Sequence, residues 1–335
     1  MNKICIFLSV FVLASCLINT SQSPEYTKIG GRTFGTYYHI TYLHPEGKNL
    51  QNEIEAKLQE FDASLSTFNN QSIISKINRN EDVVVDDFFM QMYVEAVRVS
   101  QHTHGAFDIT VAPLVNAWGF GFGEKERKET PDVAAILPYV GSQKISLQDQ
   151  RIIKTDSRIM LDASAIAKGQ AADVIGELLE AEGCKNFMVE IGGEISCKGL
   201  NPKGKKWQIG IDRPDEILLE EQRPLQTVLS LTDCGMATSG NYRQYYYRDG
   251  KKYAHTINPI TGYPVDHNLL SATVVSSSSM RADAYATAFM VLGVDSSLAI
   301  CNRLPDVACY LIAEGEDKNY EVYYSDGFSD FFSTP

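Results

Sequence analysis

Residues 243–255 read RQYYYRDGKKYAH, and they contain a clear signal for paired strands. The runs 243–248 and 251–255 flank Asp249-Gly250, a dipeptide that tolerates the positive φ angles of a tight primed turn. This pattern predicts a β-hairpin, and a second hairpin is expected to join residues 307–312 with 320–324. Further strand signals, rich in β-branched or aromatic residues, cover 36–42, 186–191, 207–212, 227–231 and 271–276.

Apolar residues at helical spacing predict four long helices among these strands. The first carries Ile54, Leu58, Phe61 and Leu65 on one face. In the second, Asp86 is a candidate N-cap, and the apolar positions are Phe89, Met92, Tyr93, Ala96 and Val97. Two more helices are expected over residues 165–182 and 281–292, each followed by a glycine, Gly183 and Gly293, and Gly183 suits a left-handed C-terminal cap.

Long helices mixed irregularly with hairpins indicate an α+β fold rather than a doubly wound parallel sheet. No repeat, low-complexity tract or long linker interrupts residues 26–335, so a single domain is expected. The composition, 44% hydrophobic and 21% charged over 335 residues, excludes a disordered or multi-span membrane protein. A net charge of −12 argues against nucleic acid as a partner, because it repels phosphate backbones.

The N-terminus has the features of a secretory signal over residues 1–15. One cation, Lys3, precedes the apolar run 4–14, which is too short to span a bilayer. The run ends in Leu13-Ala14-Ser15-Cys16, which resembles a bacterial lipobox, so Cys16 is expected to be diacylated and to anchor the chain. The alternative is an ordinary signal peptide with Cys16 incidental. With residues 16–25 as a tether, the domain is expected to lie in the cell envelope, facing the periplasm from the inner membrane.

The remaining cysteines form no CxxC pair and are odd in number. They are Cys184, Cys197, Cys234, Cys301 and Cys309. In an oxidising compartment at least one of them is therefore expected to be a free, buried thiol.

The sequence contains no P-loop, dinucleotide GxGxxG, HExxH or GxSxG motif, so the chemistry must rest on other residues. Asp283 and Thr287 lie four residues apart and share one face of a predicted helix. They form either a hydrogen-bonded core pair or two oxygen ligands for a hard cation. Mg²⁺, which takes oxygen ligands, is the metal expected in the second case.

Residues 159–169 predict an anion site. The apolar residues 159–161 are expected to form a strand that leads through Asp162 into the third helix. A helix N-terminus carries unpaired N–H groups and partial positive charge, and Lys168 in the first turn could reach a phosphate. The alternative is an Asp N-cap followed by a surface lysine.

Residues 105–121 combine aromatic, polar and glycine residues around one apolar patch, including Phe107, Asp108 and Trp118. Such a patch suits either a planar aromatic ligand or a core of aromatic side chains. Four other segments could present backbone amides to an anion or serve only as turns. They are residues 34–36, 192–194, 238–240 and 255–264.

In order along the chain, these segments resemble the ApbE family of FAD:protein FMN transferases. The resemblance covers Phe34-Gly35-Thr36, Leu65-Ser66-Thr67-Phe68, 105–110, 113–114, 118–121, 162–169, 190–194, 207–214, 237–242, 255–264 and 282–287. It implies a single T-fold-related domain of mixed or antiparallel sheets with packed helices. Phe34 stands where the family usually has Met, and Phe68 where Tyr is common, so details of the ring pocket are expected to differ.

The resemblance also implies ligands. FAD contacts fall on Phe34, Phe68, Ala106, Phe107, Asp108, Asp162, Lys168 and Ile257. Mg²⁺ ligands fall on the carbonyl of Ala165, the carboxylate of Asp283 and the hydroxyl of Thr287.

The implied reaction transfers the FMN half of FAD to a threonine hydroxyl of a target protein and releases AMP. By resemblance the acceptors are subunits of membrane redox complexes of the Rnf or Na⁺-pumping NADH:quinone oxidoreductase type. Asp283 and Lys168 are expected to assist electrostatically, and His255 is the candidate base because imidazole titrates near working pH. Two alternatives stay open: a pyrophosphatase that gives FMN and AMP, and a non-enzymatic flavin-binding lipoprotein.

Overall fold

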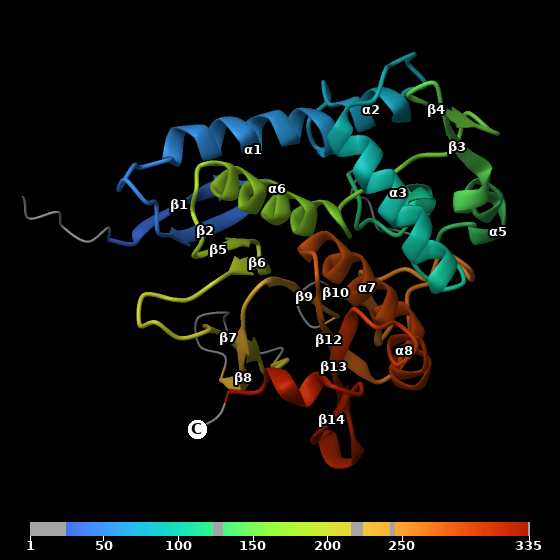
Figure 1. Cartoon of the computed structure of the whole chain (residues 1–335). Helices are drawn as coiled ribbons and strands as arrows, with labels where there is room; N and C mark the ends of the chain where they lie inside the picture. The colour runs from blue at the N-terminus through green and yellow to red at the C-terminus, as the bar shows by residue number, and fades with distance from the viewer. Residues whose placement is uncertain (1–24, 123–129, 216–223, 242–244, 334–335) are drawn as a thin grey trace, which may run out of the picture.

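The computed structural model describes residues 25–122, 130–215, 224–241 and 245–333 (Figure 1). The predicted signal segment, Cys16 and nearly all of the tether lie outside the described residues, as do Arg243 and Gln244. Among the helices of the described residues, none combines the length and apolar character that a membrane crossing requires.

An eight-stranded sheet forms the centre of the structure, and each of its strands runs antiparallel to its neighbours. Its order is β1 (Thr27–Thr33), β2 (Thr36–Tyr42), β5 (Phe187–Ile191), β6 (Glu194–Lys198), β9 (Cys234–Gly240), β12 (Leu269–Ser276), β13 (Val307–Glu314) and β14 (Tyr320–Tyr324). Three two-stranded ribbons accompany it: β3 (Ile145–Gln148) with β4 (Arg151–Lys154), β7 (Trp207–Asp212) with β8 (Leu225–Leu231), and β10 (Tyr245–Arg248) with β11 (Lys251–Ala254).

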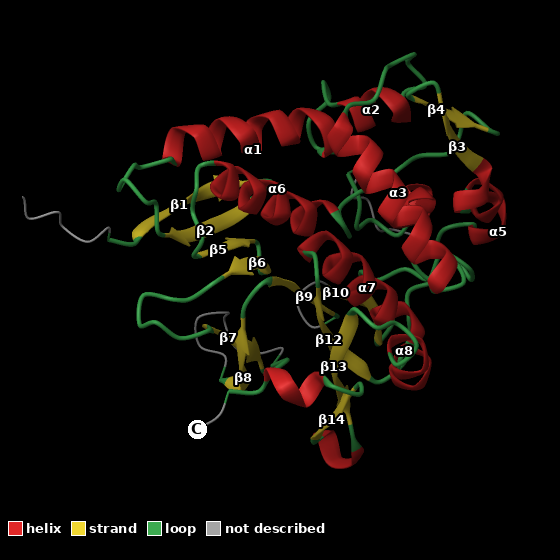
Figure 2. Ribbon diagram, viewed as in Figure 1, coloured by secondary structure: helices red, strands yellow, loops and turns green. Residues whose placement is uncertain are grey.

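The α-helices of the described residues are α1 (Gln51–Leu65), α2 (Ile73–Asn78), α3 (Asp87–His102), α4 (Ala112–Ala117), α5 (Val133–Ile136), α6 (Ala167–Ala181), α7 (Ser279–Leu292) and α8 (Val294–Cys301). Helices α6, α7 and α8 pack on the eight-stranded sheet, and α1 and α3 pack against α6 and α7, respectively (Figure 2). Helix α6 packs on β5 and β6, and α7 packs on β9 and β12. The two helices also pack on each other.

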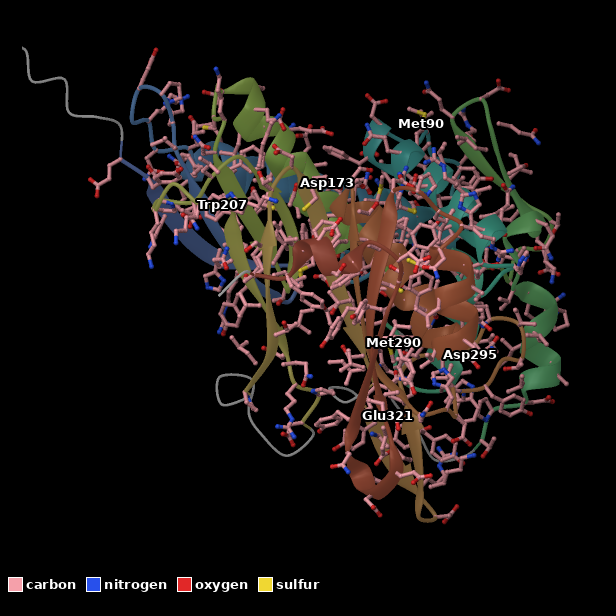
Figure 3. The ribbon with its side chains drawn as sticks, turned by 60° about the horizontal axis from the view of Figure 1, so that its bottom comes forward. Met90, Asp173, Trp207, Met290, Asp295 and Glu321 are labelled. Carbon is pink, nitrogen blue, oxygen red and sulfur yellow. The ribbon has the colours of Figure 1, made fainter. Side chains whose placement is uncertain are left out.

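Two hydrophobic cores lie on opposite faces of the sheet. The larger lies under the helices, and the smaller lies under the β7–β8 ribbon, where Trp207 contributes to it. Figure 3 brings this second face forward and labels Trp207. Strand β12 is buried at nearly every position because it supplies Val274 to the first core and Val275 to the second.

The α+β fold class and both hairpins are confirmed. The β10–β11 turn has positive φ at Asp249 (50°) and Gly250 (77°), as the primed-turn prediction requires, and β13 pairs with β14. Asp86 caps α3, since its Oδ1 accepts the Phe89 amide at 2.9 Å. The other strand signals and all four predicted helices are present.

Several boundaries were wrong. Residues 159–161 form no strand, because the Asn78 side chain pairs with both the amide and the carbonyl of Leu161 and takes the place of a neighbouring strand. Helix α6 starts at Ala167 rather than 165, and its N-cap position is Ile166, so Asp162 does not cap it. Helix α7 starts two residues early because the Ser278 hydroxyl accepts the Arg281 amide. In α3, Val99 is fully buried while Val97 is only partly buried.

Candidate active site

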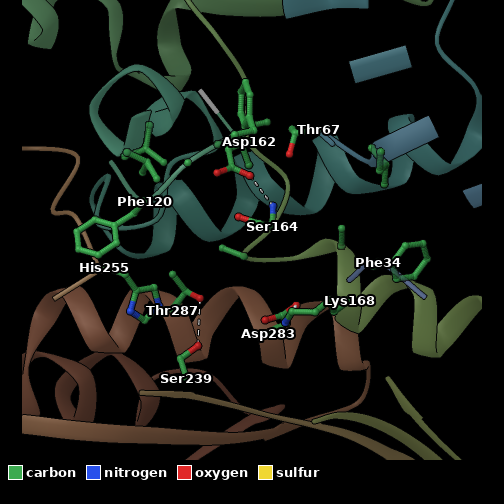
Figure 4. A pocket seen from close by; sticks show the side chains of 18 of the residues that line it. Phe34, Thr67, Phe120, Asp162, Ser164, Lys168, Ser239, His255, Asp283 and Thr287 are labelled. Atoms are coloured by element: carbon green, nitrogen blue, oxygen red, sulfur yellow. Dashed lines mark hydrogen bonds and ion pairs between the residues drawn. The ribbon is translucent and has the colours of Figure 1, made fainter. Parts of the chain in front are cut away.

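A cleft of about 960 Å³ opens over the N-terminus of α6 and the side of α7. The β1–β2 turn, the end of α1, the segment 106–122 and the loop after β11 complete its walls. Figure 4 shows the cleft, with Phe34 at one end and His255 at the other. All of the residues that the sequence predicted for FAD, metal and catalysis line it: Phe34, Phe68, Ala106, Phe107, Asp108, Asp162, Ala165, Lys168, His255, Ile257, Asp283 and Thr287.

Helices α6 and α7 cap each other beneath the cleft. Asp173 of α6 accepts the Ser279 amide at Oδ1 (2.9 Å) and the Met280 amide at Oδ2 (2.8 Å), both in the first turn of α7. In return, Asp283 Oδ2 of α7 accepts the Gly169 amide in the first turn of α6 at 3.1 Å. Each helix thereby satisfies N–H groups that the other leaves unpaired, which fixes Asp283 against the α6 N-terminus.

Lys168 bridges two buried carboxylates. Its Nζ lies 2.6 Å from Glu194 Oε1 and 3.8 Å from Asp283 Oδ2. Glu194 is only 4% exposed and Asp283 2%, and Glu194 Oε2 has no hydrogen-bond partner among the described residues. Two buried negative charges therefore share this one ammonium group, and the excess favours a further cation.

The pKa values agree with this electrostatic picture. Burial raises the pKa of Glu194 to about 7, with Lys168 opposing the rise and Asp283 adding to it. Burial likewise raises the pKa of Asp283, against the opposing effects of Lys168 and of the Gly169 amide. A positive charge that entered the cleft beside them would lower both pKa values and stabilise both carboxylates.

Oxygen atoms suited to a hard cation gather beside Asp283. Thr287 Oγ1 lies 3.2 Å from Ser239 Oγ (Figure 4). The Gly169 amide, which a regular helix would direct to the Ala165 carbonyl, donates to Asp283 instead. The described residues contain no cluster of three or more His, Cys, Asp or Glu side chains that could hold a metal. A cation here would therefore take mixed carboxylate, hydroxyl and carbonyl oxygens, as Mg²⁺ does.

Asp162 and Asp108 stabilise the loops that form the opposite wall. Asp162 Oδ1 accepts the Ser164 amide at 2.8 Å, and burial raises the pKa of Asp162. Asp108 accepts the Thr110 amide and hydroxyl at one oxygen and the Ser142 amide at the other. Burial also raises the pKa of Asp108, against these hydrogen bonds.

Aromatic residues occupy the rim. Phe34 has a positive φ of 50° in the β1–β2 turn and packs on Phe61, with ring centroids 5.6 Å apart. Phe68 is 75% exposed at the mouth of the cleft. The Phe120 ring meets the His255 ring edge-on at 6.3 Å, and in Figure 4 His255 lies toward the Thr287 end.

Trp118 does not line the cleft, although the sequence placed it in the same patch as Phe107. It is buried in a small separate core with Ile257, and its Nε1 donates to the Gly262 carbonyl at 2.8 Å. Two other residues of the site were missed as functional candidates. Glu194 was noted only as part of a glycine-containing turn, and Asp173 gave no signal beyond its place in a helix.

The comparisons with known proteins agree with this fold and cleft. Residues 34–311 match the ApbE family. A Haemophilus influenzae protein named FAD:protein FMN transferase is 37% identical over 327 residues, 93% of each chain. A Vibrio cholerae protein of the same name is 35% identical over 348 residues, 99% of each chain.

Solved structures give the same result. The flavin transferase ApbE from Vibrio cholerae has a TM-score of 0.83 at 34% identity, covering 92% of this chain and all of that one. The apo form of the Pseudomonas stutzeri flavinyl transferase ApbE has a TM-score of 0.82 at 31% identity, covering 93% of this chain and 98% of that one. The resemblance drawn from the sequence is thus confirmed, and this chain belongs to the ApbE family.

Proposed function

We propose that this protein is an FAD:protein FMN transferase that moves the FMN half of FAD onto a threonine hydroxyl of an acceptor protein and releases AMP. The observation that carries the proposal is the oxygen set of Ala165, Asp283 and Thr287 beside Lys168, in a cleft large enough for a cofactor-sized ligand. Relatives that are 31–37% identical over nearly the whole chain bear this enzyme name, which places the protein among transferases.

The proposed metal is Mg²⁺, held by the Ala165 carbonyl, an Asp283 carboxylate oxygen and the Thr287 hydroxyl. Asp283 Oδ2 accepts the Gly169 amide, and Oδ1 of the same carboxylate would be the metal ligand. When bound, Mg²⁺ would supply Lewis-acid neutralisation of pyrophosphate charge.

The protein's own groups would bind and orient the dinucleotide. Lys168 and the N-terminus of α6 face the position where the pyrophosphate would lie, and together they offer positive charge to an anion. Phe34 and Phe68 would contact the planar rings from the rim. Ala106, Phe107, Asp108, Asp162 and Ile257 would shape the remaining wall.

In the transfer step, the acceptor threonine oxygen would attack the phosphorus of the FMN half. The bond from that phosphorus to the bridging oxygen would break, and AMP would leave with the bridging oxygen. His255 is the proposed base that takes the hydroxyl proton, because it lines the cleft at the Thr287 end. Positioning and electrostatic stabilisation would provide most of the rate enhancement.

The test is to incubate the protein with FAD, Mg²⁺ and a purified acceptor subunit of the Rnf or Na⁺-pumping NADH:quinone oxidoreductase type. Flavin fluorescence that stays with the denatured acceptor, together with equimolar AMP, would support transfer. Free FMN and AMP with an unlabelled acceptor would identify a pyrophosphatase. FAD that is bound but unchanged, with or without Mg²⁺, would identify a carrier.

The role of His255 can be tested in the same assay. His255→Ala is expected to lower transfer by about 10²–10⁴-fold, the usual range for a general base, with FAD affinity nearly unchanged. A large loss of FAD binding would instead show that His255 holds the cleft together.

We also propose that the protein acts at the periplasmic face of the inner membrane, anchored through a diacylated Cys16. The support is the lipobox-like Leu13-Ala14-Ser15-Cys16 at the end of the apolar run. Mass spectrometry of the mature N-terminus would show a lipid-modified Cys16. An unmodified Cys16, or cleavage at another position, would contradict the anchor.

A further inference from the structure

Two cysteines face each other across the middle of the main sheet. In the β6–β9 pairing, Cys197 lies directly opposite Cys234, after Ile195 opposite Met236 and Ser196 opposite Gly235. Directly opposed residues of an antiparallel pair project to the same face with Cβ atoms about 4.5–5.5 Å apart. Both side chains accordingly belong to the smaller core under the β7–β8 ribbon. A disulfide needs only slightly closer Cβ atoms than this register provides.

The two thiols have unequal surroundings. Cys197 is 3% exposed, whereas Cys234 is only partly buried. The Cys197 thiol, as a hydrogen-bond partner, lowers the pKa of Cys234, and the Cys234 group in turn raises the pKa of Cys197. The more accessible sulfur is therefore also the one that more readily forms a thiolate, which is the nucleophile in disulfide exchange.

We propose that Cys197 and Cys234 form a cross-strand disulfide by exchange with a small-molecule or protein disulfide. The Cys234 thiolate attacks one sulfur of the donor disulfide, forms a mixed disulfide and releases the first donor sulfur as a thiolate. Cys197 then gives its proton to the departing first donor sulfur and attacks the Cys234 sulfur, which releases the second donor sulfur as a thiolate that is protonated by solvent. The two cysteines are oxidised by two electrons and the donor disulfide is reduced by two.

The other cysteines of the described residues serve as internal controls. Cys301 at the end of α8 and Cys309 in β13 also influence each other's pKa, but they are 1% and 0% exposed. The Cys301 thiol donates to the Val307 carbonyl at 3.1 Å. Cys184 is buried, and its burial raises its pKa to about 11. These three thiols are therefore expected to stay reduced in the folded protein.

The bond would tie together strands that reach the cleft. Glu194 is the first residue of β6, and β9 carries Ser239 near its end. The closed loop contains the whole β7–β8 ribbon, so the disulfide would restrict the unfolded chain considerably. A rise in melting temperature of roughly 3–8 °C is expected on oxidation.

The first experiment uses the folded, fully reduced wild-type protein. It is incubated with oxidised glutathione, quenched with an alkylating agent, unfolded, digested and analysed by mass spectrometry. The expected product is a peptide pair joined through Cys197 and Cys234, with the other three cysteines alkylated only after unfolding. Reduction should reverse both the link and the rise in melting temperature. The absence of this link after prolonged exposure to oxidised glutathione would overturn the proposal.

Variants test the order of the two steps. In Cys197→Ser, the mixed disulfide on Cys234 cannot be resolved, so one glutathione should remain attached there. In Cys234→Ser, Cys197 should stay unmodified because it is buried. The matched control Cys184→Ser should form the link like the wild type. Glutathione retained on Cys197 rather than on Cys234 would reverse the assigned roles and contradict the mechanism.

Discussion

The cleft has a charged region around Asp283 (the Asp283 end) and an exposed aromatic rim at Phe68 (the Phe68 end), and these two regions are built differently. At the Asp283 end, the buried carboxylates of Glu194 and Asp283 are held by Lys168 and by the N-terminus of α6. At the Phe68 end, an aromatic ring is 75% exposed and makes up part of an open rim. The first end is preorganised, whereas the second would gain most of its contacts from a bound ligand.

Because of this difference, we expect the Asp283 end to determine the rate at saturation and the Phe68 end to determine the affinity for FAD. Fixed charges act best on a transition state, because they need no rearrangement when charge develops. An exposed ring contributes mainly by burying apolar area against a bound ring, which strengthens binding of ground state and transition state alike. Substitutions at the Asp283 end should therefore change the rate at saturation, and substitutions at the rim should change affinity.

The largest effect is expected for Asp283. Asp283→Ala should reduce the proposed Mg²⁺-dependent AMP release by about 10³-fold or more, since it removes the proposed metal ligand and a fixed charge together. Asp283→Asn should lose activity similarly but stay folded, because the amide oxygen can still accept the Gly169 N–H. The measurement is AMP release over a Mg²⁺ titration.

Asp295→Ala provides the control, because this carboxylate is exposed in the first turn of the neighbouring helix α8. The Asp295→Ala variant should have the same activity as the wild type. Full activity of Asp283→Ala at high Mg²⁺ would reject Asp283 as a metal ligand and remove the basis for the division between the two ends.

The next effect concerns the contact between α6 and α7. A Cβ at Gly169 would overlap the backbone carbonyl of Ser279, which cannot move without shifting the first turn of α7. Gly169→Ala should therefore lower the free energy of unfolding by about 2–4 kcal/mol and displace Asp283. Urea denaturation and the AMP assay can measure the two effects.

Gly176→Ala in the same helix is the matched control. Its Cβ would meet only side-chain atoms of Phe187 and Ser196, at 3.2 Å, so its free energy of unfolding should stay within about 1 kcal/mol of the wild-type value. Equal free energies of unfolding for the two variants would show that the first turn of α7 can shift at little energetic cost.

Much of the fold could be predicted from local sequence. Periodicity, Asp86 and the Asp249-Gly250 turn locate helices and a hairpin, because they depend on residues that are neighbours in the chain. Strands β6 and β9 were missed, since Glu194–Lys198 and Cys234–Gly240 are short and rich in polar or glycine residues with weak strand preference. They are strands because the sheet on both sides of them supplies partners.

The candidate site was also only partly predictable from local sequence. Asp283, Thr287 and Lys168 could be selected because spacing or a family resemblance marks them. Glu194 and Asp173 could not, because their roles depend on burial between elements far apart in sequence. The false strand at 159–161 has a similar cause, since its partner is the side chain of Asn78, 83 residues away.

Glu194 gives a prediction of intermediate size that concerns pH. Its pKa is about 7 in the folded protein, against 4.5 for an ordinary glutamate side chain. Because the folded value is raised, its contribution to stability is complete below about pH 4.5 and is lost as the pH rises through about 7. Glu194→Gln removes this titration. Its stability relative to the wild type should therefore improve by roughly 1–3 kcal/mol between about pH 5 and about pH 8 in metal-free buffer.

Urea denaturation of both proteins across this pH range would measure the difference. Glu194→Ala should show the same trend with pH but a lower stability throughout, because it also leaves a cavity. If the difference in free energy of unfolding between Glu194→Gln and the wild type did not vary with pH, Glu194 would carry no buried charge at the Asp283 end.

The smallest effect is expected at the rim. Phe68→Ala removes a ring that makes few contacts in the free protein, so the free energy of unfolding should change by no more than about 0.5 kcal/mol. The KM for FAD should rise about 3–10-fold through lost aromatic contact, with kcat nearly constant. Phe68→Tyr should keep the affinity, whereas Phe34→Ala should lose stability as well, because Phe34 already packs on Phe61. If Phe68→Ala lowered kcat at saturating FAD as strongly as Asp283→Ala does, the exposed ring would be acting on the transition state, and the two ends of the cleft would not differ in function as their structures suggest.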